Sequence, residues 1–239
     1  MIDLSIIIPS HNEEGTAGLI LQKLFSIDFG DIEFEVIFVD DGSTDKTDDV
    51  LDGVNLKFRK IQHATRKGKS AAVRSGLVKA RGEYVITQDA DLELEPSDIV
   101  TLYRHALNNN LDIVYGSRRL KEKQRSMQNK TVFYHGAVIV TKVANILYRA
   151  DITDEPTCYK LLKRSLVNEM NLKEEQFAYC PEVTAKALRL GHNIEELPIS
   201  YYPRTVAEGK KVRFKDGLHA IWVLVKYRVL PVKSWRKLN

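Results

Sequence analysis

Thr87-Gln88-Asp89-Ala90-Asp91-Leu92-Glu93 is the stretch from which the fold of this 239-residue chain can be inferred. It follows an apolar run over 84–87, and a second acidic stretch, Val39-Asp40-Asp41-Gly42-Ser43, follows a similar run over 35–39. Such runs are typical of buried strands. Because the carboxyl ends of parallel strands meet at one edge of an open sheet, both acidic stretches are expected at the edge where such sheets bind ligands.

Asp89, Asp91 and Glu93 are the candidate metal ligands of the first stretch. Two aspartates one residue apart, with a glutamate two residues further on, can offer several hard oxygens to one Mg²⁺ or Mn²⁺ ion. Such an ion keeps positions open for phosphate oxygens. An acidic loop at a strand end is more often a plain solvated turn, so the assignment depends on the motifs around it.

Strand and helix patterns alternate along the first half of the chain. Strands are expected over 4–8, 34–39, 56–62, 84–87 and 112–115, and helices through 19–25 and 50–51 and over 71–80 and 98–109. Ser43 or Thr44 is the expected cap of the second helix. Five strands that alternate with helices and have acidic ends predict an α/β fold: a doubly wound, mostly parallel sheet with helices on both faces.

The pattern changes after Arg118. A polar, basic loop is expected over 118–130, followed by a helix over 132–148 that is either a core helix or one facing lipid or an oligomer partner. A turn over 154–160 should lead into a short strand, a helix over 181–190 should end at Gly191, an edge strand should cover 194–202, and a last helix 217–227. No repeat or linker interrupts the chain, which predicts one domain over 1–209 with a basic amphipathic segment over 210–239.

Basic residues are concentrated at the C-terminal end of the chain. Residues 210–239 contain nine Lys or Arg and one acidic residue, although the net charge of the whole chain is only +4. Such a segment is expected to meet phosphate groups or an anionic membrane surface. No RNA-binding signature or zinc-finger spacing supports a nucleic-acid partner.

Three absences in the sequence bear on cellular location. Cys158 and Cys180 form neither a disulfide framework nor a metal-ligand pattern, which favours a reducing compartment. No basic region precedes the first apolar run, as a signal peptide would require. The longest uncharged stretch, 131–141, has 11 residues and is too short to span a bilayer. The chain is therefore expected in the cytoplasm, peripherally associated with the cytoplasmic face of a membrane.

Gly68-Lys69-Ser70 resembles part of a phosphate-binding P-loop. That motif requires a glycine five residues before Gly68, where this chain has His63, so the P-loop interpretation is rejected. A basic loop at the N-terminus of a helix can still receive a phosphate group.

Taken together, the motifs resemble the inverting family 2 glycosyltransferases of GT-A fold, and more narrowly the dolichyl- or polyprenyl-phosphate mannose and glucose synthases. The resemblance covers nearly the whole chain, and its blocks, each weak alone, occur in the order typical of the family. They are Pro9-Ser10-His11-Asn12-Glu13, Val39-Asp40-Asp41-Gly42-Ser43, 69–76, Asp89-Ala90-Asp91, Gly116-Ser117-Arg118, 154–160, Pro198-Ile199-Ser200, and Arg204 with Glu208-Gly209-Lys210-Lys211.

The resemblance implies a nucleotide-sugar donor, GDP- or UDP-hexose, and a lipid-phosphate acceptor. The residues implied to hold the donor nucleotide are Pro9, His11, Glu13, Val39, Asp41, Lys69, Asp89 and Ala90. The implied phosphate-binding residues are Arg118, Arg204 and Lys210, the metal ligands Asp89, Asp91 and Glu93, and the catalytic residues Asp91, Arg118 and Asp154. The implied activity is metal-dependent, inverting transfer of mannose or glucose to dolichyl or undecaprenyl phosphate.

Asp154 is the residue on which the acceptor class depends. In relatives that glycosylate a sugar hydroxyl, an acidic residue in this region acts as the base, whereas in the lipid-phosphate relatives the matching aspartate positions the acceptor or supports the loop. A polyprenyl phosphate is already anionic at neutral pH and needs cations more than a base. Two alternatives stay open: transfer to a sugar hydroxyl in polysaccharide or glycoconjugate assembly, and a non-catalytic nucleotide-sugar binder. A homo-oligomer or a membrane-protein partner is also left open.

Overall fold

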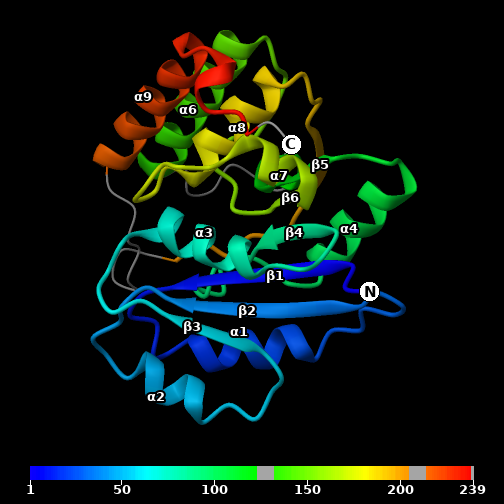
Figure 1. Ribbon diagram of the computed structural model, residues 1–239, viewed down its shortest axis with the longest axis vertical. Helices are drawn as coiled ribbons and strands as arrows, with labels where there is room; N and C mark the ends of the chain where they lie inside the picture. The colour runs from blue at the N-terminus through cyan, green and yellow to red at the C-terminus, as the bar shows by residue number, and fades with distance from the viewer. Residues whose placement is uncertain (123–131, 205–213, 238–239) are drawn as a thin grey trace.

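The computed structural model describes residues 1–122, 132–204 and 214–237, and within them a seven-stranded sheet forms the centre of the molecule (Figure 1). The strand order is β3-β2-β1-β4-β6-β5-β7. The strands are β1 (Leu4–Ser10), β2 (Phe34–Asp40), β3 (Arg59–Gln62), β4 (Tyr84–Thr87), β5 (Ile113–Ser117), β6 (Lys160–Lys163) and β7 (Glu195–Pro198). Only β6 runs antiparallel to its neighbours, β4 and β5. The predicted mostly parallel α/β sheet is confirmed.

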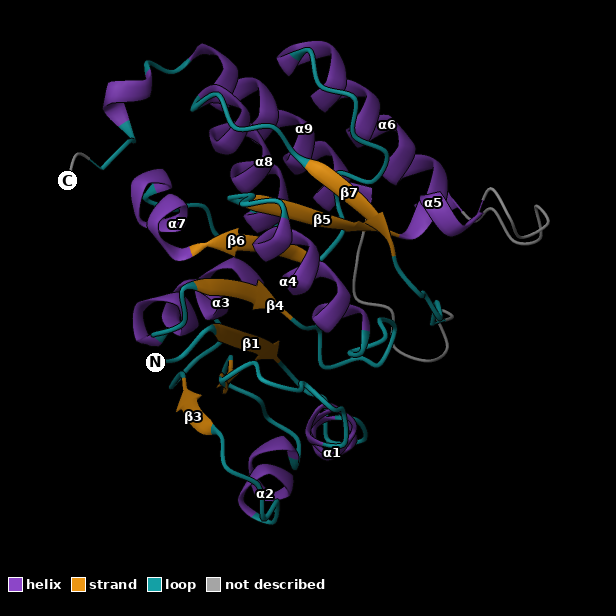
Figure 2. Cartoon of the chain, turned by 90° about the vertical axis from the view of Figure 1, so that its right-hand side faces the viewer, coloured by secondary structure: helices purple, strands orange, loops and turns teal. Residues whose placement is uncertain are grey.

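Helices cover both faces of this sheet (Figure 2). They are α1 (Ala17–Phe25), α2 (Thr47–Asp52), α3 (Lys69–Lys79), α4 (Asp98–Asn108), α5 (Arg118–Glu122), α6 (Val132–Tyr148), α7 (Arg164–Met170), α8 (Tyr179–Arg189), α9 (Phe214–Val229) and a 3₁₀ turn (Val232–Ser234). Ile6 and Ile8 of β1 pack with α1 and α4 on one face, whereas Ile7 packs with α3 and α8 on the other. Burial on both faces explains why the middle of β1, Ile6-Ile7-Ile8, is a continuous apolar run.

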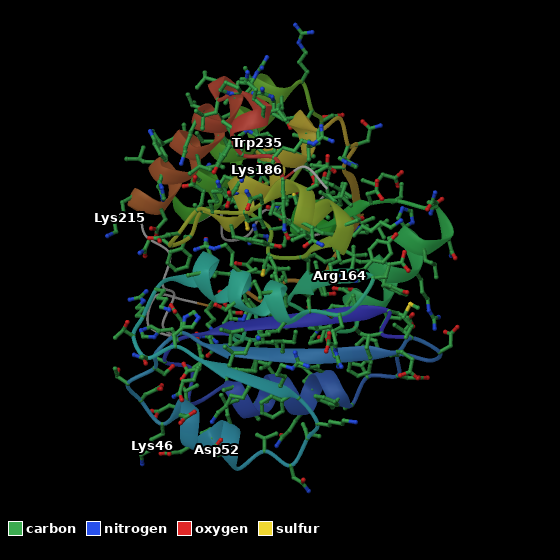
Figure 3. The ribbon with its side chains drawn as sticks, in the orientation of Figure 1. Lys46, Asp52, Arg164, Lys186, Lys215 and Trp235 are labelled. Carbon is green, nitrogen blue, oxygen red and sulfur yellow. The ribbon has the colours of Figure 1, made fainter. Side chains whose placement is uncertain are left out.

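The helices α6 and α9 form a further layer on α8, away from the sheet (Figure 1). Val223, Leu224 and Tyr227 of α9 are buried in this layer together with Trp235. Figure 3 shows Trp235 beside Lys186 of α8, whose Nζ lies 5.3 Å from the indole ring centroid. The helix α9 and Trp235 are thus packed on the domain. The predicted boundary between 209 and 210 lies outside the described residues.

Several local expectations are corrected by the structure. The stretch 118–130 begins as the helix α5 rather than as a loop, and 123–131 lies outside the described residues. Neither Ser43 nor Thr44 caps α2: Lys46 precedes that helix, and the carboxylate of Asp45 accepts the backbone N–H of Thr47 instead. Gly191 does follow α8 with a left-handed φ of +88°. None of the described helices combines the length and the apolar character needed to cross a bilayer.

Candidate active site

The acidic stretches meet at the carboxyl edge of the sheet, as predicted. Asp41 follows β2, the segment 88–93 follows β4, and β1 lies between these two strands and pairs in parallel with both. Arg118 follows β5 at the same edge, because β5 is parallel to β7 and antiparallel to β6, which is antiparallel to β4. Parallel topology therefore brings together residues that are far apart in the sequence.

Lys69 faces the first aspartate of the D-x-D motif. Its Nζ lies 2.6 Å from Oδ1 and 2.8 Å from Oδ2 of Asp89. Burial opposes the charge on Lys69, but the carboxylate of Asp89 raises the pKa of Lys69 well above its ordinary value. Lys69 is the first residue of α3, and Gly68 before it has a φ of +98°, which favours glycine. A fixed cation at a helix N-terminus is thus placed where a phosphate group can be bound.

Asp91 lies close to two other carboxylates, those of Asp89 and Glu93. Burial, followed by the charges of Asp89 and Glu93, raises the pKa of Asp91 to about 7. Among the described residues, no three acidic, histidine or cysteine side chains converge in an arrangement ready to hold a metal ion. Two carboxylates are nevertheless enough for a Mg²⁺ ion that also binds phosphate oxygens. The donor chemistry and the excess negative charge of Asp89 and Asp91 therefore fit a divalent cation.

Arg204 connects three predicted site residues. Its backbone N–H donates to Oε1 of Glu93 at 2.8 Å, and its Nε donates to the carbonyl of Asp91 at 2.7 Å. Its Nη2 lies 3.2 Å from Oε2 of Glu13. Arg204 thus closes the D-x-D loop against the loop after β1. Lys210, the other predicted phosphate contact of this region, lies outside the described residues.

Arg118 and Asp154 form a bidentate ion pair. Nε and Nη2 of Arg118 lie 2.7 Å and 2.8 Å from the two carboxylate oxygens, and the backbone N–H of Arg118 adds a third hydrogen bond of 3.0 Å. The Asp154 side chain is fully buried, whereas that of Arg118 is 22% exposed. Burial alone would raise the pKa of Asp154, but Arg118 holds it below its ordinary value. The carboxylate of Asp154 thus anchors Arg118.

The residues predicted to hold the nucleoside differ in what they offer a ligand. Val39 pairs with Pro9, and its side chain is in the core, so it can contact a ligand only through its backbone. Nδ1 of His11 lies 3.1 Å from the carbonyl oxygen of Asp41. The carboxylate of Asp41 contacts the ring of His63 and accepts the backbone N–H groups of Lys67 and Gly68. Ala90 is buried in the loop. These nucleoside contacts remain predictions.

Tyr201 and His63 are two site residues that the sequence reasoning missed. The guanidinium carbon of Arg118 lies 5.1 Å from the ring centroid of Tyr201, whose hydroxyl hydrogen-bonds Glu93. The sequence signal for Tyr201 was its place as an aromatic residue just after the edge strand β7. His63 occupies the position at which a P-loop would have glycine, and it is buried next to Asp41.

Residues 5–170 match the sequence model of glycosyl transferase family 2. The chain is 27% identical over 252 residues to a dolichyl-phosphate beta-glucosyltransferase of Trichomonas vaginalis, covering 98% of this chain and 75% of that protein. It is 29% identical over 216 residues to a dolichol-phosphate mannosyltransferase of Pyrococcus furiosus, covering 87% and 58%. A dodecaprenyl-phosphate galacturonate synthase of Rhizobium johnstonii is 24% identical, with 85% and 60% covered. The chain thus spans about three-fifths of the second and third of these relatives.

The fold is similar to that of a solved glycosyltransferase. Glucosyl-3-phosphoglycerate synthase from Mycobacterium tuberculosis, in complex with Mn²⁺, UDP and phosphoglyceric acid, superposes with a TM-score of 0.73 over 96% of this chain and 79% of that chain. A Mg²⁺ and UDP complex of the same enzyme gives 0.71. At 17% identity, this likeness establishes the fold alone, and it confirms the predicted GT-A architecture.

Proposed function

Because the chain belongs to glycosyl transferase family 2, we propose that it moves a hexose, mannose or glucose, from a GDP- or UDP-sugar to a polyprenyl phosphate. Names of relatives that include dolichyl, dolichol and dodecaprenyl phosphate support the acceptor class. The observation that carries the proposal is the bidentate pair of Arg118 with the fully buried Asp154.

The state of Asp154 favours a phosphate acceptor over a hydroxyl. A general base must reach the proton that it removes, by direct contact or through one water. Both oxygens of Asp154 already accept hydrogen bonds from Arg118, and the side chain is fully buried. A polyprenyl phosphate requires no such base, since the second pKa of a phosphate monoester lies near 6. It requires a cation, and the partly exposed Arg118 provides one.

The donor half of the site matches the charge that develops during transfer. Departure of the nucleotide builds negative charge on its diphosphate, and Lys69 at the N-terminus of α3 is placed to offset that charge. A Mg²⁺ or Mn²⁺ ion held by Asp89 and Asp91, with Glu93 nearby, would neutralise the same leaving group. The carboxylates of the D-x-D loop also favour the positive character of the sugar carbon. Arg204 holds this loop in place through Asp91 and Glu93.

We expect inversion at the anomeric carbon, because the resemblance to inverting enzymes implies a single displacement and because two carboxylates of the described site are already paired: Asp154 with Arg118, and Asp89 with Lys69. The test is to supply an α-linked nucleotide hexose, polyprenyl phosphate and Mn²⁺, and to analyse the extracted lipid by NMR. A β-linked hexosyl phosphate is the expected product. An α-linked product would contradict single displacement, and the absence of any glycosylated lipid would contradict the proposed acceptor.

The proposed site of action is the cytoplasmic face of a membrane, contacted through α9. Leu218, Trp222, Val225 and Val229 follow helical spacing on this helix and are 43–73% exposed. Ile139 and Ile146 of the neighbouring α6 are also exposed. Asp216 is the single acidic residue of α6 and α9, whereas Lys215 extends outward at the start of α9 (Figure 3). An apolar stripe with cations beside it matches an anionic lipid surface.

The Leu218→Ser/Val225→Ser double variant is expected to bind anionic vesicles roughly tenfold more weakly than the wild type, because apolar area is lost from the contact. Trp222 serves as the fluorescent reporter, since it is exposed while Trp235, the other tryptophan, is buried. The matched control is Val78→Ser/Leu107→Ser, which removes exposed apolar side chains from α3 and α4. Equal vesicle binding of both double variants would contradict the membrane assignment. Self-association of the wild type through the same residues would instead favour a second copy of the chain as the partner.

A further inference from the structure

His63 is buried between two polar groups at the start of the segment that connects β3 with Lys69. Its side chain is 6% exposed. Nδ1 lies 2.7 Å from Oδ1 of Asp41, and Nε2 lies 2.8 Å from Oγ of Ser75. One neutral tautomer satisfies both contacts: Nδ1–H donates to the carboxylate, and Nε2 accepts the hydroxyl of Ser75. His63 therefore connects α3 with the loop after β2.

The carboxylate that His63 holds also fixes the backbone before α3. Oδ1 of Asp41 accepts the backbone N–H of Lys67 at 2.9 Å, and Oδ2 accepts that of Gly68 at 2.7 Å. The next residue is Lys69, whose Nζ contacts both carboxylate oxygens of Asp89. A continuous set of short contacts thus runs from Ser75 through His63 and Asp41 to the cation placed at the D-x-D motif.

We propose that His63 is a positioning residue for the donor diphosphate. By donating to Asp41, it keeps that carboxylate in the orientation that binds the N–H groups of Lys67 and Gly68, and so it sets the place of the Lys69 ammonium. The ligand class is a nucleoside diphosphate or nucleotide sugar, and this inference rests on the proposed function. His63 acts through Lys69 and does not touch the ligand.

Two substitutions separate the two contacts of His63. The amide nitrogen of an asparagine lies close to the place of Nδ1, so His63→Asn can keep the hydrogen bond to Asp41. His63→Gln places its amide near Ser75 and leaves Asp41 without that donor. The matched control is His105→Gln, because His105 on α4 contacts Glu195 on the outer surface, remote from Asp41. Melting temperatures show whether each variant is folded.

The experiment is calorimetric titration with GDP, UDP and their hexose conjugates in the presence of Mn²⁺. We expect His63→Gln to weaken nucleotide binding about tenfold and His63→Asn by no more than about threefold. The reason is that only His63→Gln leaves the carboxylate of Asp41 without one of its hydrogen-bond donors. In a Lys69→Met background, His63→Gln should add less than about a twofold loss, because the residue through which it acts is gone. Equal losses in both backgrounds, or wild-type affinity of His63→Gln, would overturn the proposal.

A wild type that binds none of these nucleotides would contradict the proposed function, and the position of His63 can still be tested without a ligand. Amide hydrogen exchange of Lys67 and Gly68 in the free protein reports whether their hydrogen bonds to Asp41 persist. Faster exchange in His63→Gln than in His63→Asn is the expected result. Equal exchange rates in the two variants would overturn the role of His63 whatever the protein binds.

Discussion

Asp91→Ala is expected to lower the rate of hexose transfer roughly a thousandfold or more, because it removes a carboxylate from the group that would hold the divalent cation on the leaving diphosphate. The protein should remain folded, since Asp91 lies in a loop after β4 and takes no part in the apolar core. The matched control is Asp49→Ala on the exposed face of α2, which should leave transfer unchanged. Retained transfer in Asp91→Ala, or transfer insensitive to a chelator, would contradict the metal assignment.

The same substitution has a pH signature in the metal-free protein. The pKa of Asp91 is raised from 3.8 to about 7 by burial and by the neighbouring carboxylates. A raised carboxyl pKa means that the folded state binds its proton more tightly than the unfolded state, so stability falls as pH rises from about 4 through 7. Asp91→Ala should lose less stability than the wild type between pH 5 and pH 8. The measurement is thermal unfolding of both proteins in the presence of a chelator at several pH values. An equal loss of stability in both proteins would contradict the raised pKa of Asp91.

Asp154→Ala is expected to cost about 3–5 kcal/mol of folding free energy and most of the transfer activity. It leaves the Arg118 guanidinium without the buried carboxylate that positions it, and breaking one partner of a buried pair carries this cost. Replacing both partners, as in Arg118→Met/Asp154→Leu, should recover much of the stability, because an apolar pair of similar volume has no charge to desolvate. Transfer should not recover, since the Arg118 cation proposed to face the acceptor phosphate is gone.

The control for this pair is Glu35 with Arg81, in which Nε and Nη2 of Arg81 both donate to Oε2 of Glu35. The Arg81 side chain is 61% exposed, and the pair lies at the end of β2 opposite the site. Glu35→Leu/Arg81→Met should leave transfer unchanged. The double variant at Arg118 and Asp154 distinguishes a catalytic cation from a structural pair: a stable protein with normal transfer would show that the pair serves only folding. A transfer rate that falls on acidification near neutral pH in the wild type, but not in Asp154→Asn, would instead indicate that Asp154 is a general base.

The sheet edge that carries the site could be predicted because it follows from local sequence. Each acidic stretch comes directly after an apolar run, and parallel pairing places such positions together. The antiparallel insertion of β6 between β4 and β5 could not be predicted in this way. Lys160–Lys163 contains two apolar residues between two lysines, so its direction and neighbours are decided by pairing across the sheet. The helix α7 was missed for a similar reason, since its seven residues follow β6 without a break.

The sequence also indicated which charged residues are candidates for the site, whereas it did not indicate how they pair. Asp154 could equally be a base, an anchor or a turn residue in the sequence, and the structure places it against Arg118, 36 residues away. Arg204 meets Glu13 across a separation of 191 residues, and Glu93 across 111. Such contacts depend on tertiary packing, which composition and spacing do not report. The contacts of His63 with Asp41 and Ser75 likewise join residues that are 22 and 12 positions apart in the sequence.

The proposal that this chain transfers a hexose to a lipid phosphate is tested most directly by competition between three acceptors. A panel of GDP- and UDP-hexoses would be incubated with Mn²⁺ and with polyprenyl phosphate, the matching polyprenol or a free sugar, followed by mass spectrometry of the organic and aqueous phases. The expected result is one hexose added to polyprenyl phosphate and none to the polyprenol, because Arg118 provides a cation for a phosphate while Asp154 is not free to activate a hydroxyl. Hexose added to the polyprenol or to the free sugar at a comparable rate would contradict a lipid-phosphate acceptor.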